Sequence, residues 1–372
     1  MKKAKVVLFV LFGLFIGQPL FGQGITVSAE KLDKRDSIYY YQNKPFDGIS
    51  VLYHPTKKDQ LWQRIEWKNG RIDGWFKSWY FSGKKNEEIE YTKGYRNGVY
   101  RTWFENGNQD QIYHYTMGEK DGECQDFYPA GSIWRSINYK MGVKEGLETS
   151  WFTNGKIQHE TNFKEGVPDG KSTNYVEWGR VSSEINYKMG VVHGAYRTFH
   201  SNGVLAEESN YVDGFLEGKK LVFDENGNKL TSETYKKGNL EGPALIYMSG
   251  KDKMSKTLII EQKNYKDGKL DGLFVRYDSG VVADRGIYVE GKKEGLWVEN
   301  ASNPVTLSKG NYEHGKRVGK WIMGETDFLG KRTGSYNKEG KPDGKWKIYD
   351  KKGKLIRLEY WEDGVLKKRK FK

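Results

Sequence analysis

The stretch Tyr91-Thr-Lys-Gly94-Tyr-Arg-Asn-Gly98-Val-Tyr-Arg-Thr-Trp103-Phe-Glu-Asn-Gly107 recurs along this 372-residue chain with its aromatic residues and glycines in register. Its first aromatic position returns every 24 residues and then continues with less regular spacing. The strictly spaced members are Trp67, Tyr91, Tyr115, Tyr139, Phe163, Tyr187, Tyr211 and Tyr235, and the later ones are Tyr265, Tyr288, Tyr312, Tyr336 and Trp361. A fixed period of this length is the signature of a tandem repeat array.

Each repeat contains two reversals of the chain. Asn-Gly is the strongest short signal for a type I′ hairpin turn, in which both central residues have positive φ. Such turns are predicted inside the repeats at 106–107, 154–155, 202–203 and 226–227. Paired glycines, as at Gly94 and Gly98, mark the reversal that leads to the next repeat. The sequence therefore predicts an all-β fold, an elongated single-layer antiparallel β-meander of tandem hairpin repeats of ~24 residues.

This arrangement resembles the MORN-repeat variant family of bacterial proteins, some of which are labelled YwqK-type antitoxins. The resemblance extends over residues 41–364. The eukaryotic MORN motif differs, because two residues rather than one separate the aromatic residue from the first glycine here, and only His193-Gly194 is similar to its later His-Gly. The label implies an antitoxin or immunity protein that binds a toxin.

The first segment of the chain, residues 1–23, predicts a secretory signal peptide. Three lysines precede an apolar run from Val6 to Ile16, and Gly22 offers a small residue for cleavage. A membrane anchor is the alternative, but the run is shorter than the ~20 apolar residues of a spanning helix. We therefore expect an exported protein, periplasmic, at the cell surface or extracellular, with no transmembrane segment after cleavage.

Three further segments follow the leader. Residues 24–40 are expected to form an N-terminal cap, residues 41–366 a MORN-like array of about 13 units, and residues 367–372 a basic C-terminal tail. Between Leu296 and Gly334 the second aromatic column lapses, and tryptophans stand two residues after the second glycines instead. This shift predicts that the last units pack differently.

Composition bounds the chemistry. The formal net charge is +13. Three of the lysines lie in the leader and five basic residues lie in the tail, so the excess of positive charge on the repeats is small. We therefore expect no nucleic-acid partner. Cys124 is the only cysteine, which excludes a disulfide framework and is typical of a packed small residue. Carboxylates before the second glycines recur ~10 Å apart, too far to share a calcium ion. We expect no metal site and no cofactor.

No catalytic motif is present in the repeats. Gly166 to Ser172 is similar to a phosphate loop, but three residues rather than four separate its glycines. A glycan hydrolase would need a positioned carboxylate pair that the repeats do not single out. The sequence therefore predicts a protein that is not an enzyme.

The aromatic columns offer a candidate binding surface. Most aromatic residues in a pleated sheet are structural, because they pair across strands. Trp79, Trp103 and Trp151 share the fifth place after the second glycines of their repeats, at intervals of ~10 Å that are too long for them to stack on each other. They are therefore the candidate partner-binding face. The first half is rich in tryptophan at Trp62, Trp67, Trp75, Trp79, Trp103, Trp134, Trp151 and Trp178.

Two functions follow from these observations. The first is an exported, non-enzymatic repeat protein that serves as a binding or scaffold module for a protein partner or a cell-envelope polymer such as a glycan. The alternative is an antitoxin or immunity protein that binds an exported toxin. An adjacent toxin gene would favour the second.

Overall fold

The computed structural model describes residues 24–250, 258–303, 306–324 and 329–372. They form two compact units, one ending at Val143 and the other running from Lys144 to Lys372. The predicted signal peptide, residues 1–23, lies outside the described residues. Within the described ranges, no helix is long and apolar enough to span a membrane.

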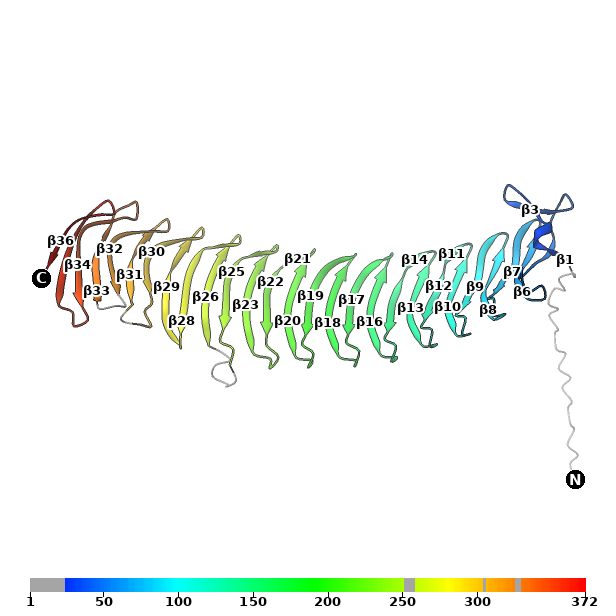
Figure 1. Ribbon diagram of the computed structural model, residues 1–372, viewed down its shortest axis with the longest axis horizontal. Coiled ribbons are helices and arrows are strands. Elements are labelled where there is room, and N and C mark those ends of the chain that lie inside the picture. Colours follow the sequence, from blue (N-terminus) through cyan, green and yellow to red (C-terminus); the bar gives the residue numbers. More distant parts are fainter. Residues whose placement is uncertain (1–23, 251–257, 304–305, 325–328) are drawn as a thin grey trace, which may run out of the picture. The chain divides into compact units, whose positions relative to one another are not determined.

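The first unit consists of strands and one short 3-10 helix, η1 (Ala29–Lys31). In chain order (Figure 1) its strands are β1 (Ile25–Ser28), β2 (Asp33–Arg35), β3 (Ile38–Tyr41), β4 (Lys44–Pro45), β5 (Gly48–Tyr53), β6 (Leu61–Lys68), β7 (Arg71–Trp79), β8 (Lys85–Thr92), β9 (Tyr95–Trp103), β10 (Gln109–Thr116), β11 (Glu119–Lys120), β12 (Gly122–Phe127) and β13 (Ile133–Lys140). The boundary between the units falls inside β14 (Val143–Lys144).

The second unit continues the same alternation of strands and turns. Its strands are β15 (Gly146–Trp151), β16 (Ile157–Lys164), β17 (Val167–Tyr175), β18 (Val181–Lys188), β19 (Val191–Phe199), β20 (Leu205–Val212), β21 (Phe215–Leu216), β22 (Gly218–Phe223), β23 (Lys229–Lys236), β24 (Asn239–Leu240), β25 (Gly242–Tyr247), β26 (Ile259–Lys266), β27 (Lys269–Leu270), β28 (Gly272–Asp278), β29 (Val281–Val289), β30 (Lys292–Glu299), β31 (Ser308–Glu313), β32 (Lys316–Gly324), β33 (Leu329–Tyr336), β34 (Pro342–Asp350), β35 (Leu355–Glu362) and β36 (Val365–Phe371).

Within each unit, successive strands pair antiparallel with their neighbours in sequence. In the first unit this holds from β5 through β10 to β12 and β13, and in the second from β28 to β36. The predicted fold class, an all-β antiparallel meander of hairpin repeats, is confirmed.

The two ends of the chain depart from the repeat in different ways. β1 runs parallel to β5, and β2, β3 and β4 form a small sheet of their own. Residues 367–371, expected in a basic tail, instead belong to β36, which pairs with β35. Without β36, strand β35 would leave its N–H and C=O groups unpaired at the edge of the sheet, and β36 pairs with them. The lysines of β36 then oppose pairing of the new edge with another strand.

The turns inside the repeats are not of the predicted type. At 106–107 only Gly107 has positive φ (99°), and Asn106 does not. The Gly107 N–H donates to the Phe104 carbonyl, and the Phe104 N–H donates to the Asn108 carbonyl. This pattern is a three-residue loop, a type I turn followed by a glycine bulge. The predicted type I′ turn at Asn-Gly is therefore wrong.

The side chain of the asparagine explains the difference. Asn106 Oδ1 accepts from the Asn108 N–H at 2.9 Å, and its Nδ2 donates to the Pro129 carbonyl of the next hairpin at 2.7 Å. Asn154 and Asn202 make the equivalent pairs of bonds. These residues thus link consecutive hairpin turns.

Type I′ geometry occurs at the other reversal, between repeats. Lys93 and Gly94 both have positive φ, 51° and 89°. β8 and β9 pair directly across them, Thr92 opposite Tyr95, as a two-residue loop requires. Methionine, glutamate or aspartate takes the first place in other repeats, as at Met117, Glu165 and Asp213.

A bulge lies just inside each of these turns, at the second glycine. Around Gly194 (φ 98°) the pairing of β18 with β19 shifts between Ile185 and Tyr187. The skipped residue, Asn186, donates from Nδ2 to the Ala195 carbonyl at 2.8 Å. Asn162 and Asn264 make the same contact with the strands that follow them. The side chain therefore satisfies a carbonyl that the bulge removes from the ladder.

Alternation of side chains gives each sheet a core face and an outer face. The core face carries the first aromatic residue of each repeat and most of the fully buried side chains. Residues directly opposite each other on this face complement each other in size, as Ser50 does with Ile65 and Cys124 with Ile137. This pairing fills space in a sheet that has no second layer of its own.

The core face of β29–β34 pairs tryptophan with glycine. Trp297, Trp321 and Trp346 are fully buried, and each lies where a side chain on a glycine of the preceding strand would be. A Cβ atom on Gly334 would lie 1.9 Å from Trp346 Cδ2. Tyrosines fill the remaining space through edge-to-face contacts, with centroid distances of 5.1 Å for Tyr288–Trp297, 5.2 Å for Tyr312–Trp321 and 5.2 Å for Tyr336–Trp346. The predicted change of packing in the last units is confirmed.

Candidate functional site

The three candidate tryptophans occupy equivalent places at the ends of β7, β9 and β15. Trp79 and Trp103 lie in the first unit and Trp151 in the second. Each is the last strand residue before a hairpin turn and follows a shift in register, opposite Lys85, Gln109 and Ile157 respectively. All three side chains are half-buried.

Trp103 is held by its own sheet. The Tyr80 hydroxyl donates to its carbonyl at 2.6 Å, and the Lys85 ammonium lies 5.1 Å from its ring centroid. Lys85 is also the register partner of Trp79. This cation–π contact supports the position of Trp103, so its ring already has a partner. The role of Trp79, Trp103 and Trp151 in binding stays a hypothesis.

The most exposed tryptophans are others. Trp62, Trp134 and Trp178 are 42%, 41% and 58% exposed. Trp178 lies in a hairpin turn rather than in a strand. The repeat pattern could not identify these three tryptophans, because they do not stand at the aromatic positions that recur from repeat to repeat.

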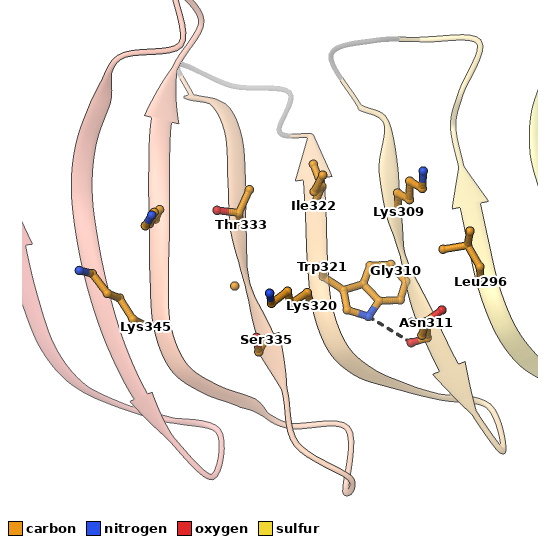
Figure 2. Close-up of a pocket in the computed structure, with 12 residues that line it drawn as sticks. Leu296, Lys309, Gly310, Asn311, Lys320, Trp321, Ile322, Thr333, Ser335 and Lys345 are labelled. Atoms are coloured by element: carbon orange, nitrogen blue, oxygen red, sulfur yellow. Dashed lines mark hydrogen bonds between the residues drawn. The ribbon is translucent and has the colours of Figure 1, made fainter.

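A second candidate site is a groove of about 490 Å³ on the outer face of β30–β34. Four lysines, two aliphatic side chains and three polar side chains line it (Figure 2): Lys309, Lys320, Lys345, Lys347, Leu296, Ile322, Asn311, Thr333 and Ser335. Leu296 and Ile322 are exposed, at 55% and 46%. No sequence motif marks this groove, so it was not predicted from the sequence.

Backbone forms part of the floor of this groove, because the residues of each strand alternate between the two faces. Gly310, Trp321 and Gly334 line it, and each stands between two outer-face residues of its strand, so it contributes backbone there. The Trp321 indole lies on the core face, where its Nε1 donates to the Asn311 carbonyl at 3.2 Å (Figure 2). The buried tryptophans thus support the groove from behind.

The core face of the first unit holds a buried polar cluster. Asp126 is 5% exposed and accepts from Arg135 Nε at 2.9 Å and from the Tyr113 hydroxyl. Burial and the hydrogen bond to Asp126 raise the pKa of Tyr113 above its usual value. Burial also raises the pKa of the Cys124 thiol, which is 1% exposed. Cys124 is therefore a packed residue rather than a reactive one.

Among the residues that the structure describes, no group of three or more His, Cys, Asp or Glu side chains is placed to hold a metal ion.

The geometry defines a β-repeat protein built from hairpins, and comparison with known families gives its class. Residues 120–141, 144–165, 192–213 and 342–363 match the MORN repeat variant model. These four segments match MORN repeats of the variant type, and repeats of this type suggest a repeat-based binding module. No curated protein matches the chain.

Solved structures show only weak likeness. The crystal structure of TcdB2-TccC3 is 10% identical over 84% of this chain and 18% of its own, with a TM-score of 0.17. That of TcdB2-TccC3-Cdc42 is 11% identical over 84% and 18%, with a TM-score of 0.16. TcdB2-TccC3 without its hypervariable C-terminal region is 11% identical over 88% and 20%, with a TM-score of 0.17. The chain spans a fifth or less of the length of those chains, and likeness at this level indicates neither its fold nor its function.

Proposed function

We propose that this protein is exported and acts, without catalysis, as a binding or scaffold module for a cell-envelope polymer or a protein partner. The observation that carries the proposal is the outer face of β30–β34. It presents a groove with charged, polar and aliphatic side chains on a sheet whose other face is packed with tryptophan. A surface with mixed side chains binds a partner without needing a reacting group.

Export rests on the leader pattern of residues 1–23. A C-terminally tagged full chain, expressed in a bacterial host and fractionated, should be recovered outside the cytoplasm with a mature start near Gln23 or Gly24. N-terminal sequencing reads that start directly. Recovery of intact Met1 in the cytoplasmic pool would contradict export.

Binding is tested by retention of envelope material on the immobilised mature chain. We expect an envelope polymer or protein to be retained and to be released chemically unchanged, as a non-enzymatic module requires. No retention from any envelope fraction would refute the proposal. Trp103→Ala, compared with the parent chain for both thermal stability and retention, shows whether the tryptophan face contributes. A loss of stability of roughly 3 kcal/mol, typical of a buried large aromatic, would assign Trp103 to structure instead.

The antitoxin interpretation stays a prediction. Co-expression with a toxin encoded beside the gene tests it, and rescue of growth by the mature chain is the supporting result.

A further inference from the structure

We infer that the groove on the outer face of β30–β34 binds an acidic polysaccharide that lies across the strands. This inference rests on the proposed binding function and names the chemistry of the partner. It commits to a linear glycan with repeated carboxylate groups. Its evidence is the charge, the register and the side-chain chemistry of the groove.

Among the residues that the structure describes, the lysines of this groove have no acid as an ion-pair partner. Lys309, Lys320, Lys345 and Lys347 are all exposed, and no ion pair joins any of them to an acid within the described ranges. A lysine earlier in the same unit does have an acidic partner. Lys171, which follows its second glycine as Lys320 does, contacts Glu184 at 2.6 Å.

The repeat register shows why the two regions differ. Glu184 lies three residues before the first aromatic of its repeat, and Glu208 holds the same place in the next repeat, where it contacts Arg197 at 2.7 Å. The equivalent residues near the groove are Lys309, Thr333 and Leu358. This place is acidic at Glu160, Glu184 and Glu208. It is not acidic from Ser232 onward, and near the groove it is basic, polar or aliphatic, while lysines remain in the neighbouring columns.

The cations form a row that crosses the strands. Direct register partners connect Lys309 through Ile322 and Thr333 to Lys347. The same register continues through Leu358, which is buried, to Lys370 of β36. At about 4.8 Å per strand, Lys309 and Lys347 are roughly 14 Å apart and Lys347 and Lys370 roughly 10 Å apart. A polymer lying across the strands therefore meets a positive charge every two or three strands.

The surrounding charge reinforces the row. Residues 286–372 contain 21 lysines and arginines against 12 aspartates and glutamates, whereas residues 24–285 contain 38 against 37. The charge excess outside the leader is therefore concentrated in the groove strands and in the C-terminal residues that follow them. A net positive charge of this kind attracts a polyanion from solution, and the attraction weakens as salt is added.

The side chains favour a glycan over other polyanions. Single-stranded nucleic acid needs exposed aromatic rings for base stacking, but Trp297, Trp321 and Trp346 are buried on the opposite face. A peptide strand is captured through main-chain hydrogen bonds at a free sheet edge, and strands β31–β34 are paired on both sides. Recognition here must use side chains. Lysines, hydroxyls and the exposed aliphatic groups of Leu296 and Ile322 match the carboxylates, hydroxyls and C–H groups of an acidic sugar chain.

The test measures binding of polygalacturonate to the purified mature chain, beside neutral dextran, polyglutamate and oligo(dT). We expect binding of polygalacturonate that falls steeply with ionic strength, and no binding of dextran. Tighter binding of polyglutamate or oligo(dT) than of polygalacturonate would overturn the inference and assign the groove to an acidic protein or a nucleic acid.

Matched charge reversals locate the site. Lys320→Glu and Lys345→Glu should each weaken polygalacturonate binding by roughly tenfold, as expected for losing a favourable charge contact and adding a repulsive one. Lys219→Glu is the control, because Lys219 is exposed and also directly follows a second glycine, but lies in β22. It should change affinity by less than about twofold. Equal losses in all three variants would refute a localised site.

The outcomes separate this inference from the proposed function. Retention of envelope material without binding of polygalacturonate would sink the inference alone. Circular dichroism confirms that each variant is folded, and Lys320→Gln removes the charge without adding repulsion, so a smaller loss in the same direction is expected. A loss in Lys320→Glu that is accompanied by unfolding, with no effect of Lys320→Gln, would also count against the groove.

Discussion

The tryptophan–glycine packing behind the groove makes a sharp prediction for Gly334→Ala. Gly334 has ordinary extended backbone, so alanine is allowed there, but its Cβ would lie 1.9 Å from Cδ2 and 2.2 Å from Cε2 of Trp346. The indole must move or the strand must shift. Overpacking of a filled site costs roughly 1–3 kcal/mol, and we expect Gly334→Ala to destabilise β33 and β34 by that amount.

The reasoning is tested by a double-mutant cycle. Trp346→Ala alone should cost roughly 3–5 kcal/mol, since it removes a fully buried indole. In that background Gly334→Ala no longer meets a ring, and it should be neutral or stabilising by roughly 0.5–1 kcal/mol, the usual advantage of alanine over glycine in a strand. The two substitutions should therefore be strongly coupled.

Hydrogen exchange of the β33 and β34 amides is the suitable assay, because repeat arrays open locally and a single global unfolding energy averages over many units. Ser335→Ala, next in sequence but on the outer face, is the control and should change stability by less than about 0.5 kcal/mol. Unchanged protection in Gly334→Ala, or the same cost with and without the indole, would refute the proposed packing.

Three other predictions concern the repeats. Asn202→Ala removes two hydrogen bonds to backbone groups, one of them to the next hairpin, and should lower the local stability by roughly 1–2 kcal/mol in hydrogen exchange, whereas the equivalent Asn226→Ala should cost less. Burial, followed by the charge of Glu87, raises the pKa of Tyr100 to about 12. The stability that this tyrosine contributes is therefore complete below pH ~10 and is lost as the pH rises toward 12. The melting temperature of Tyr100→Phe should fall less than that of the parent chain over this pH range. Deletion of residues 187–210, one whole repeat, should leave a folded protein by circular dichroism, whereas deletion of 12 residues should not, because a half-repeat exchanges the core and outer faces.

The sequence by itself determined the repeat, the strands and the division of side chains between two faces. These features depend on local spacing: glycines where backbone reverses and aromatic residues at a constant interval are readable without knowing what packs against them. The late shift of tryptophan to the place two residues after the second glycine was also visible, and it correctly predicted a different packing in the last units.

Turn type was not decided locally. Asn-Gly by itself favours a type I′ turn, but the asparagine side chain bonds to the hairpin of the next repeat, 23 residues away, and this contact exists only in the assembled sheet. The same is true of the lysines. Lys171 and Lys320 occupy the same place in their repeats, and only the register with the following strand places a glutamate beside the first and a serine opposite the second. The groove therefore comes from tertiary structure, because the strength of a charge depends on the neighbours that pairing brings to it.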